Sequence, residues 1–215
     1  MTLLERPVPV GEVFASALRG QPCVVVADDG EALLPAHAWT RDADPDDHQI
    51  LGLCVGPTVD VGCGPGRMAH AIARTGRPVL GIDVVPEAVR QSLGRGVAAL
   101  LRDVFGPVPG EGRWATALLA DGNIGIGGDP VALLERLRQL IAPTGRIVAE
   151  VAPHGVGVRT RHVRLRSAAG VSEPFPWTVV GADAVGAVAE AAGLRLSATH
   201  RHGQGRFSAV LEVPA

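Results

Sequence analysis

A glycine-rich segment that begins with an acidic residue is the part of this sequence best suited to bind a ligand. It reads Asp60-Val-Gly-Cys-Gly-Pro-Gly66 and continues a short apolar run that starts at Pro57. Glycines let the backbone approach a ligand where a side chain would block it. A helix that begins directly after such a loop favours negative groups at its amino end. In an open parallel sheet, this kind of loop lies beyond the carboxyl ends of the strands, where nucleotides bind.

Three details narrow the choice of nucleotide. The third glycine, Gly66, comes one place too early for the dinucleotide fingerprint, and Arg67 occupies the position of its last glycine. The carboxylate of Asp60 would repel a pyrophosphate but suits a cationic ligand. Asp83 ends the next apolar run, 21 residues after Gly62, where an acid can accept hydrogen bonds from ribose hydroxyls. A ribose ligand that carries positive charge and no phosphate is S-adenosylmethionine, which the segment therefore predicts as the cofactor.

The segment from Val59 to Gly66, followed by Val79-Leu-Gly-Ile-Asp83, resembles motif I and the second-strand acid of class I S-adenosylmethionine-dependent methyltransferases. The similarity in element order runs from about Pro57 to the end of the chain. It implies that the loop glycines face the methionine and ribose, that Asp83 holds the ribose hydroxyls, and that Asp103 contacts the adenine amino group. The predicted cofactor-binding residues are Asp60, Gly62, Cys63, Gly64, Gly66, Asp83, Asp103, Val104 and Asp121.

Each of these assignments has a plainer alternative. The glycines could form a tight turn only, Asp83 could cap the helix that Pro86 opens, and Asp103 could be a surface acid. Cys63 fits a small residue that fills the loop better than a nucleophile.

The segment Asp121-Gly-Asn123 follows the fourth strand, and the resemblance places it on the methyl-transfer side. His154 comes just after the fifth strand and is a candidate base. We therefore predict His154 and Asn123 as catalytic residues; the alternatives are a carbonyl cap and a flexible connector. No metal site is predicted, because Glu150-Val-Ala-Pro-His154 lacks the Asp-Asn pair of catechol-type relatives.

Four arginines at 159, 161, 164 and 166 form the only dense positive run in the chain. Two readings of this segment stay open: a solvated edge strand protected by charge, and a lid whose arginines recognise a carboxylate or phosphate. Alternate residues of a strand point to opposite faces, so at most two of the four could point into a pocket.

Strands that alternate with helices predict an α/β fold with a mostly parallel, doubly wound sheet and helices on both faces. The resemblance adds seven strands in the order 3-2-1-4-5-7-6, with strand 7 antiparallel. We predict an N-terminal extension over 1–43 that forms a hairpin cap, and a Rossmann-like domain over 44–215 with a lid insertion at 152–181. The predicted strands cover 23–27, 31–34, 57–61, 77–83, 96–101, 114–120, 146–151, 194–200 and 207–213, and the predicted helices cover 10–18, 45–55, 67–74, 86–94, 130–141 and 182–192.

Composition excludes several classes of protein. The chain has 215 residues, a hydrophobic fraction of 47% and a formal net charge of −2, which argue for one folded domain and against a general nucleic-acid binder. No apolar run reaches membrane-spanning length, the first seven residues do not read as a secretory signal, and three cysteines make no disulfide framework. The sequence thus predicts a cytoplasmic enzyme that methylates a small molecule, with an anionic one favoured, and that has neither nucleic acid nor membrane as partner. Alternatives are a regulatory protein that binds S-adenosylmethionine without catalysis and, less favoured, a nicotinamide-dependent oxidoreductase.

Overall fold

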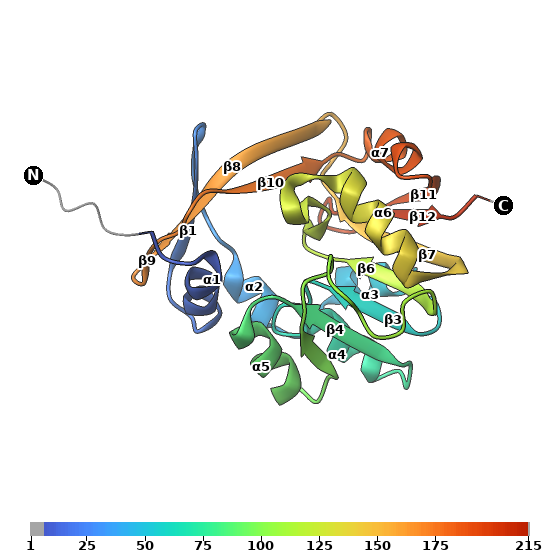
Figure 1. Ribbon diagram of the computed structural model, residues 1–215, viewed down its shortest axis with the longest axis horizontal. Helices are drawn as coiled ribbons and strands as arrows, with labels where there is room; N and C mark the ends of the chain where they lie inside the picture. The colour runs from blue at the N-terminus through green and yellow to red at the C-terminus, as the bar shows by residue number, and fades with distance from the viewer. Residues whose placement is uncertain (1–6, 215) are drawn as a thin grey trace, which may run out of the picture.

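A seven-stranded sheet forms the centre of the computed structural model, which describes residues 7–214 (Figure 1). The first six residues lie outside the described part. They belong to the predicted extension, and the prediction that no secretory signal is present rests on them. The strands are arranged as β5-β4-β3-β6-β7-β12-β11, and β12 runs antiparallel to both of its neighbours. This order is the predicted one, so the fold class and topology are confirmed. The strands are β3 (Thr58–Val61), β4 (Val79–Asp83), β5 (Ala99–Leu101), β6 (Trp114–Leu119), β7 (Ile141–Val151), β11 (Arg195–Arg201) and β12 (Phe207–Glu212).

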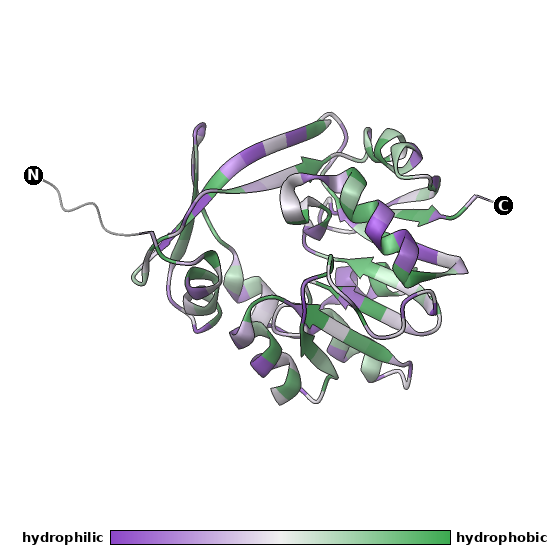
Figure 2. Ribbon diagram, viewed as in Figure 1, coloured by the Kyte–Doolittle hydropathy of each residue, from purple (hydrophilic) through white to green (hydrophobic). Residues whose placement is uncertain are grey.

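Helices cover both faces of this sheet because its central strands are apolar on both faces. On β6, Leu118 packs toward α3 (Pro45–Leu51) and α4 (Arg67–Ala73). Its neighbours Ala117 and Leu119 belong instead to the core beneath α6 (Pro130–Leu140) and α7 (Val185–Ala191). Strand residues alternate between faces, so one apolar run supplies two cores. Figure 2 shows this concentration of hydrophobic residues in the central strands.

The long helix α6 illustrates how local sequence sets an element. The Asp129 side chain accepts a hydrogen bond from the Ala132 amide, and Pro130 occupies the first helical position. Both features stabilise a helix start. Its leucines 133, 134, 137 and 140 recur on one face and are fully buried.

Several predicted boundaries were wrong. Helix α3 ends at Leu51 rather than near Val55, because the chain must turn back into β3: the Val55 backbone pairs with the Thr116 hydroxyl. Strand β7 begins at Ile141 rather than at Arg146, and it runs through Pro143. The pairing of β6 with β7 is irregular between its Trp114 and Thr116 positions, and irregularities of this kind accommodate a proline.

A second sheet brings together two segments that are far apart in the sequence. Its order is β10-β8-β1-β2, with β9 paired to β8. Strands β1 (Cys23–Ala27) and β2 (Gly30–Leu33) form the predicted hairpin, and β1 also pairs with β8 (Val158–Ser167). The remaining strands are β9 (Gly170–Val171) and β10 (Phe175–Val180).

One face of this sheet packs on α1 (Val10–Leu18) and α2 (Ala36–Thr40) through the cluster that contains Val13, Cys23 and Leu165. We call α1, α2 and the five strands of the second sheet the cap. The cap contacts the main domain at two places: α1 packs on α5 (Pro86–Gly94), and β10 packs on the short helix η1 (Asn123–Gly128). Within residues 7–214, no helix is long and apolar enough to cross a membrane.

Candidate active site

The glycine-rich loop joins β3 to α4 at the carboxyl edge of the main sheet, as predicted. Gly62, Gly64 and Gly66 all have positive φ, at 68°, 54° and 83°. A side chain at Gly62 would lie 2.7 Å from the Asn123 amide nitrogen, and one at Gly66 would lie 2.5 Å from the Ser92 hydroxyl. A side chain at Gly64 would meet no atom within 4 Å. Packing inside the protein therefore requires two of the glycines, whereas only Gly64 borders open space where a ligand could lie.

Asp83 stands at the end of β4 and holds this loop in place. Its Oδ2 accepts a hydrogen bond from the Gly64 amide at 2.9 Å, and its Oδ1 accepts one from the Val85 amide at 2.8 Å. Burial raises the pKa of this carboxyl, and the backbone hydrogen bonds counteract the rise. The amino-terminal cap of α5 is Val85, so Asp83 is not the helix cap of the alternative reading. Each carboxylate oxygen keeps a lone pair for a ligand hydroxyl.

Asp60 lies deeper than the sequence suggested. The residue is 1% exposed, and its Oδ2 has no hydrogen-bond partner among the described residues. Burial, followed by the negative charge of Asp121, raises the pKa of Asp60 to about 7. Because this pKa exceeds that of the unfolded chain, the carboxyl favours folding below about pH 4 and loses that contribution as pH rises through 7.

Cys63 has the surroundings of a residue that fills space. Its thiol is buried against Gly81, where a side chain would lie 2.7 Å from the sulfur. Burial also raises the pKa of Cys63, which disfavours the nucleophilic thiolate.

Asp103 and Val104 follow β5 at the same edge of the sheet. Asp103 is exposed and accepts a hydrogen bond from the Phe105 amide at 3.0 Å, whereas Val104 is buried in the core. The neighbouring Arg102 amide bonds to the Asp83 carbonyl at 2.9 Å. Asp103 is therefore close to Asp83 along the edge, and its contact with adenine stays a prediction.

Asn123, at the start of η1, holds the glycine loop. Its amide nitrogen donates to the carbonyls of Val61 at 3.0 Å and Gly62 at 2.9 Å. These contacts use both amide hydrogens, so the geometry supports a positioning role. A direct catalytic role for Asn123 stays a prediction.

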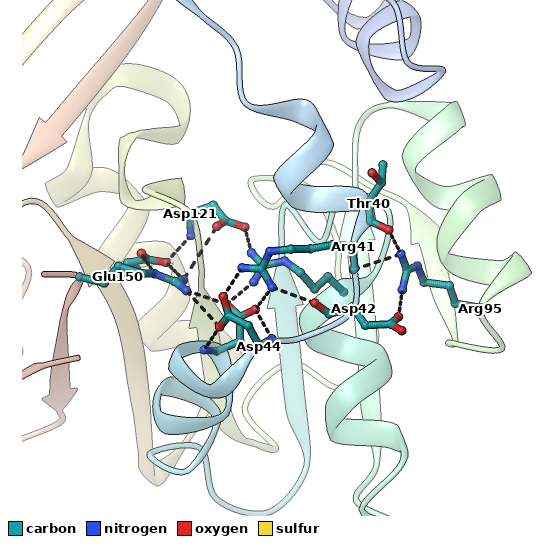
Figure 3. A network of polar contacts seen from close by, with 10 residues as sticks. Thr40, Arg41, Asp42, Asp44, Arg95, Asp121 and Glu150 are labelled. Carbon is teal, nitrogen blue, oxygen red and sulfur yellow. Dashed lines mark hydrogen bonds and ion pairs between the residues drawn. The ribbon is translucent and has the colours of Figure 1, made fainter. Parts of the chain in front are cut away.

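A network of charged residues joins the start of α4 to α3 and to the ends of β6 and β7, and Figure 3 shows it with Asp44, Asp121 and Glu150 labelled. Arg67, the first residue of α4, is 3% exposed and forms ion pairs with the fully buried Asp47 and, at 2.5 Å, with Asp121. Arg206 pairs with Asp47 at 2.8 Å and with Glu150 at 2.7 Å. These ion pairs hold the pKa of Asp47 well below its usual range, even though burial opposes this.

The network ties the loop to elements that sequence reasoning had not connected with it. Asp121, predicted to contact the cofactor, directs its carboxylate to Arg67, and its amide donates to Glu150 at 2.8 Å. Asp47 lies at the start of α3, where its Oδ2 also completes a capping box with Asp44. The only signal in the sequence for this network was the arginine at position 67.

His154 lies apart from this network. The residue is exposed in the turn after β7, and its ring packs edge-on against Phe207 with centroids 5.4 Å apart. Among the described residues, no hydrogen bond joins His154 to Asn123. Its role as a base stays a prediction.

The four arginines lie on a strand that is internal to the cap sheet, so the edge-strand reading was wrong. Arg161 pairs with Asp29 at 2.9 Å and Arg166 with Glu31 at 2.5 Å, while Arg164 donates to the Ser172 carbonyl at 3.1 Å. Arg159 has no partner among residues 7–214.

Comparison with known proteins gives a consistent result. Residues 59–149 match the model of the methyltransferase domain family, whereas no curated protein sequence matches the chain. A solved S-adenosylmethionine-dependent methyltransferase from Bacteroides fragilis, in complex with S-adenosylhomocysteine, is 22% identical with a TM-score of 0.81, and covers 100% of this chain and 98% of its own.

Two further solved structures share the fold. The 1,6-didemethyltoxoflavin N1-methyltransferase of Burkholderia thailandensis is 18% identical, with a TM-score of 0.63 and coverage of 100% and 93% of the two chains. The sugar N-methyltransferase KedS8 of a Streptoalloteichus species is 15% identical, with a TM-score of 0.56 and coverage of 79% and 87%. In the described part of this chain, no group of three or more His, Cys, Asp or Glu residues is arranged to hold a metal ion.

Proposed function

We propose that the protein is a class I S-adenosylmethionine-dependent methyltransferase that transfers a methyl group to a small molecule; the match of residues 59–149 to the methyltransferase domain family supports this. The observation that carries the proposal is the hydrogen bond between the Gly64 amide and Asp83, at the one loop glycine that borders open space. A carboxylate with spare lone pairs beside an open backbone fits a ribose that carries two hydroxyls.

The residues of the site position the reactants. Asp83 holds the ribose, and the open backbone at Gly64 admits the methionine portion. Asn123 and the Arg67 network keep the loop rigid. The bound cofactor supplies an electrophilic methyl group on a sulfonium with a neutral leaving group. In-line positioning therefore provides most of the catalysis, and a base is needed only where the acceptor atom keeps its proton. His154 is the candidate for that base.

The cap is the candidate site for acceptor recognition, because the main sheet accounts for the cofactor alone. We assign its strands β8–β10 to the lid insertion and its amino-terminal part to the extension. The proposal includes an anionic acceptor and a cytoplasmic location. Arg159 supports an anionic acceptor, since its side chain has no protein partner among the described residues. The three buried, unbridged cysteines support a cytoplasmic location, because they fit a reducing compartment.

Charge reversal at Arg159 tests the anionic acceptor. Arg159→Glu is expected to raise the acceptor KM by about tenfold or more, because a charge-assisted hydrogen bond contributes roughly 1.5–3 kcal/mol. The affinity for S-adenosylhomocysteine should stay unchanged. Steady-state kinetics measure the first quantity and calorimetry the second. Arg113→Glu, an exposed arginine before β6, is the matched control. An acceptor KM that moves equally in both variants would remove Arg159 from the site.

Ligand binding tests the function as a whole. We expect S-adenosylhomocysteine to raise the melting temperature of the protein, whereas NAD and NADP should leave it unchanged. At a ligand concentration of about 100 Kd the stabilisation is about 2.7 kcal/mol, which a thermal-shift measurement resolves. Stabilisation by NAD or NADP alone would favour the oxidoreductase. Binding of S-adenosylhomocysteine without turnover, in a screen of small acids with labelled S-adenosylmethionine, would favour the regulatory protein.

A further inference from the structure

Four aromatic side chains form a continuous arc on the cap. Trp39 lies 6.5 Å from Phe14, Phe14 lies 6.3 Å from Phe175, and Phe175 lies 6.5 Å from Trp177, measured between ring centroids. They come from α2, α1 and β10, and β10 lies far from the two helices in the sequence. The chain has only four Phe, three Trp and no Tyr. More than half of its aromatic residues are therefore gathered in this arc.

One end of the arc lies near the proposed cofactor site. Phe14 and Trp39 pack against Ala88 of α5 and against Val85, the cap residue of that helix. The Val85 amide donates a hydrogen bond to Asp83. One side of the arc therefore lies next to the carboxylate that is proposed to hold the ribose.

Each end of the arc is connected to the glycine loop through intervening residues. At one end, the indole of Trp177 lies against Gly125, where a side chain would be 2.9 Å from the indole nitrogen. Gly125 is two residues beyond Asn123, which holds the loop. At the other end, Trp39 precedes Arg41, which pairs with Asp47 at 2.6 Å and through it reaches Arg67. The arc thus reaches from η1 at one end to the segment that leads into α3 at the other.

The aromatic side chains are not fully enclosed. All four are partly exposed, and Trp177 belongs to none of the hydrophobic clusters formed by the described residues. The indole nitrogen of Trp114 donates to the Pro109 carbonyl at 3.0 Å, whereas those of Trp39 and Trp177 have no partner within residues 7–214. Neither of these two nitrogens is among the buried polar atoms that lack a partner, so both reach solvent. A partly buried indole normally finds a hydrogen-bond partner.

We propose that the arc is the wall against which the methyl acceptor binds, and that the acceptor carries a flat aromatic ring. This inference rests on the proposed function, since it names the substrate class of the same site. Offset or edge-on stacking on Trp177 and Phe175 favours a flat ring over a saturated ring of equal size. The free indole N–H groups supply donors for oxygen substituents on that ring. A cap that needed only a hydrophobic core would be served equally well by aliphatic residues.

Two probes of equal charge and similar size test whether the site prefers a flat ring. 4-Hydroxybenzoate and trans-4-hydroxycyclohexanecarboxylate each carry one carboxylate and one hydroxyl, but only the first has an aromatic ring. Affinities for both are measured by calorimetry or ligand-observed NMR, with and without saturating S-adenosylhomocysteine. We expect the wild-type protein to bind the flat acid about tenfold more tightly.

Substitutions in the arc test whether its side chains cause the preference for the flat acid. In Trp177→Leu and in Phe175→Leu the ratio of the two affinities should fall toward one, while Trp177→Phe should keep most of it. The Kd for S-adenosylhomocysteine should be unchanged in all three. Trp114→Phe, at a tryptophan outside the arc, is the control and should keep the wild-type ratio. Two leucine variants at different positions guard against misfolding of either one, which thermal unfolding would reveal.

The outcomes distinguish this inference from the function on which it rests. Equal affinities for the two acids in the wild-type protein, no binding of either, or a ratio that survives both leucine substitutions would overturn the inference. Failure to bind S-adenosylhomocysteine would instead overturn the proposed function. The ratio measured without cofactor would still decide whether the arc prefers a flat ring.

Discussion

Asp83→Ala is expected to weaken the binding of S-adenosylhomocysteine by roughly 10- to 150-fold. The carboxylate would lose hydrogen bonds to the ribose hydroxyls, and hydrogen bonds to a charged group contribute about 1.5–3 kcal/mol. The loss of affinity should be larger still, because Asp83 also accepts a hydrogen bond from the Gly64 amide of the loop, and this amide would then have no partner. The effect should therefore lie toward the upper end of the range. Calorimetric titration of the purified variant measures it.

Glu135→Gln is the matched control for this measurement. Glu135 is an exposed acid on α6, and its neutralisation removes one negative charge from the protein without touching the loop. If Asp83→Ala binds S-adenosylhomocysteine as tightly as this control does, Asp83 does not hold the ribose. The site would then have to be sought away from the end of β4.

Arg67→Met is expected to lower the free energy of unfolding by about 3–5 kcal/mol, because removing one member of a buried ion pair leaves an uncompensated charge. Arg67 is 3% exposed and Asp47 is fully buried. Methionine retains much of the side-chain volume, so lost packing contributes little. Asp121 loses the same partner, at 2.5 Å. Urea unfolding followed by circular dichroism measures the change.

The same substitution at an exposed ion pair provides the comparison. Arg166 pairs with Glu31 on the cap, and both side chains are nearly half exposed, at 46% and 48%. Water screens this pair, so Arg166→Met should cost less than about 1 kcal/mol. Equal losses in the two variants would mean that burial of the Arg67 network contributes nothing to stability.

The sequence by itself determined the main sheet and the position of its ligand loop. Both follow from patterns that act over a few residues. Apolar runs separate into strands and helices by their period, and Asp129-Pro130 starts α6 wherever that segment lies. Glycines at 62, 64 and 66 produce a left-handed backbone that other residues rarely adopt. The alternation of strands and helices then restricts the topology, because connections between parallel strands are right-handed.

Tertiary structure alone decided which partners these residues meet. Asp47 binds Arg206 across 159 positions of the chain, and no local pattern links two such distant charges. Gly66 is glycine because Ser92 of α5 packs against it, whereas Gly64 faces open space. Pairing of β1 with β8 makes the arginine-bearing strand internal, which no periodicity within β8 could indicate.

The candidate acceptor site shows most clearly what the sequence determines and what only the tertiary structure decides. Phe14, Trp39, Phe175 and Trp177 lie in three separate elements, and no local pattern in the sequence predicts that they meet. Only the cap sheet and its two contacts with the main domain bring their rings within stacking distance. The physical reason is that a hydrophobic pattern records whether a residue is buried, because burial is a property of one side chain and its solvent. It does not record which side chains share the buried space, because that depends on contacts formed only when distant segments pack together.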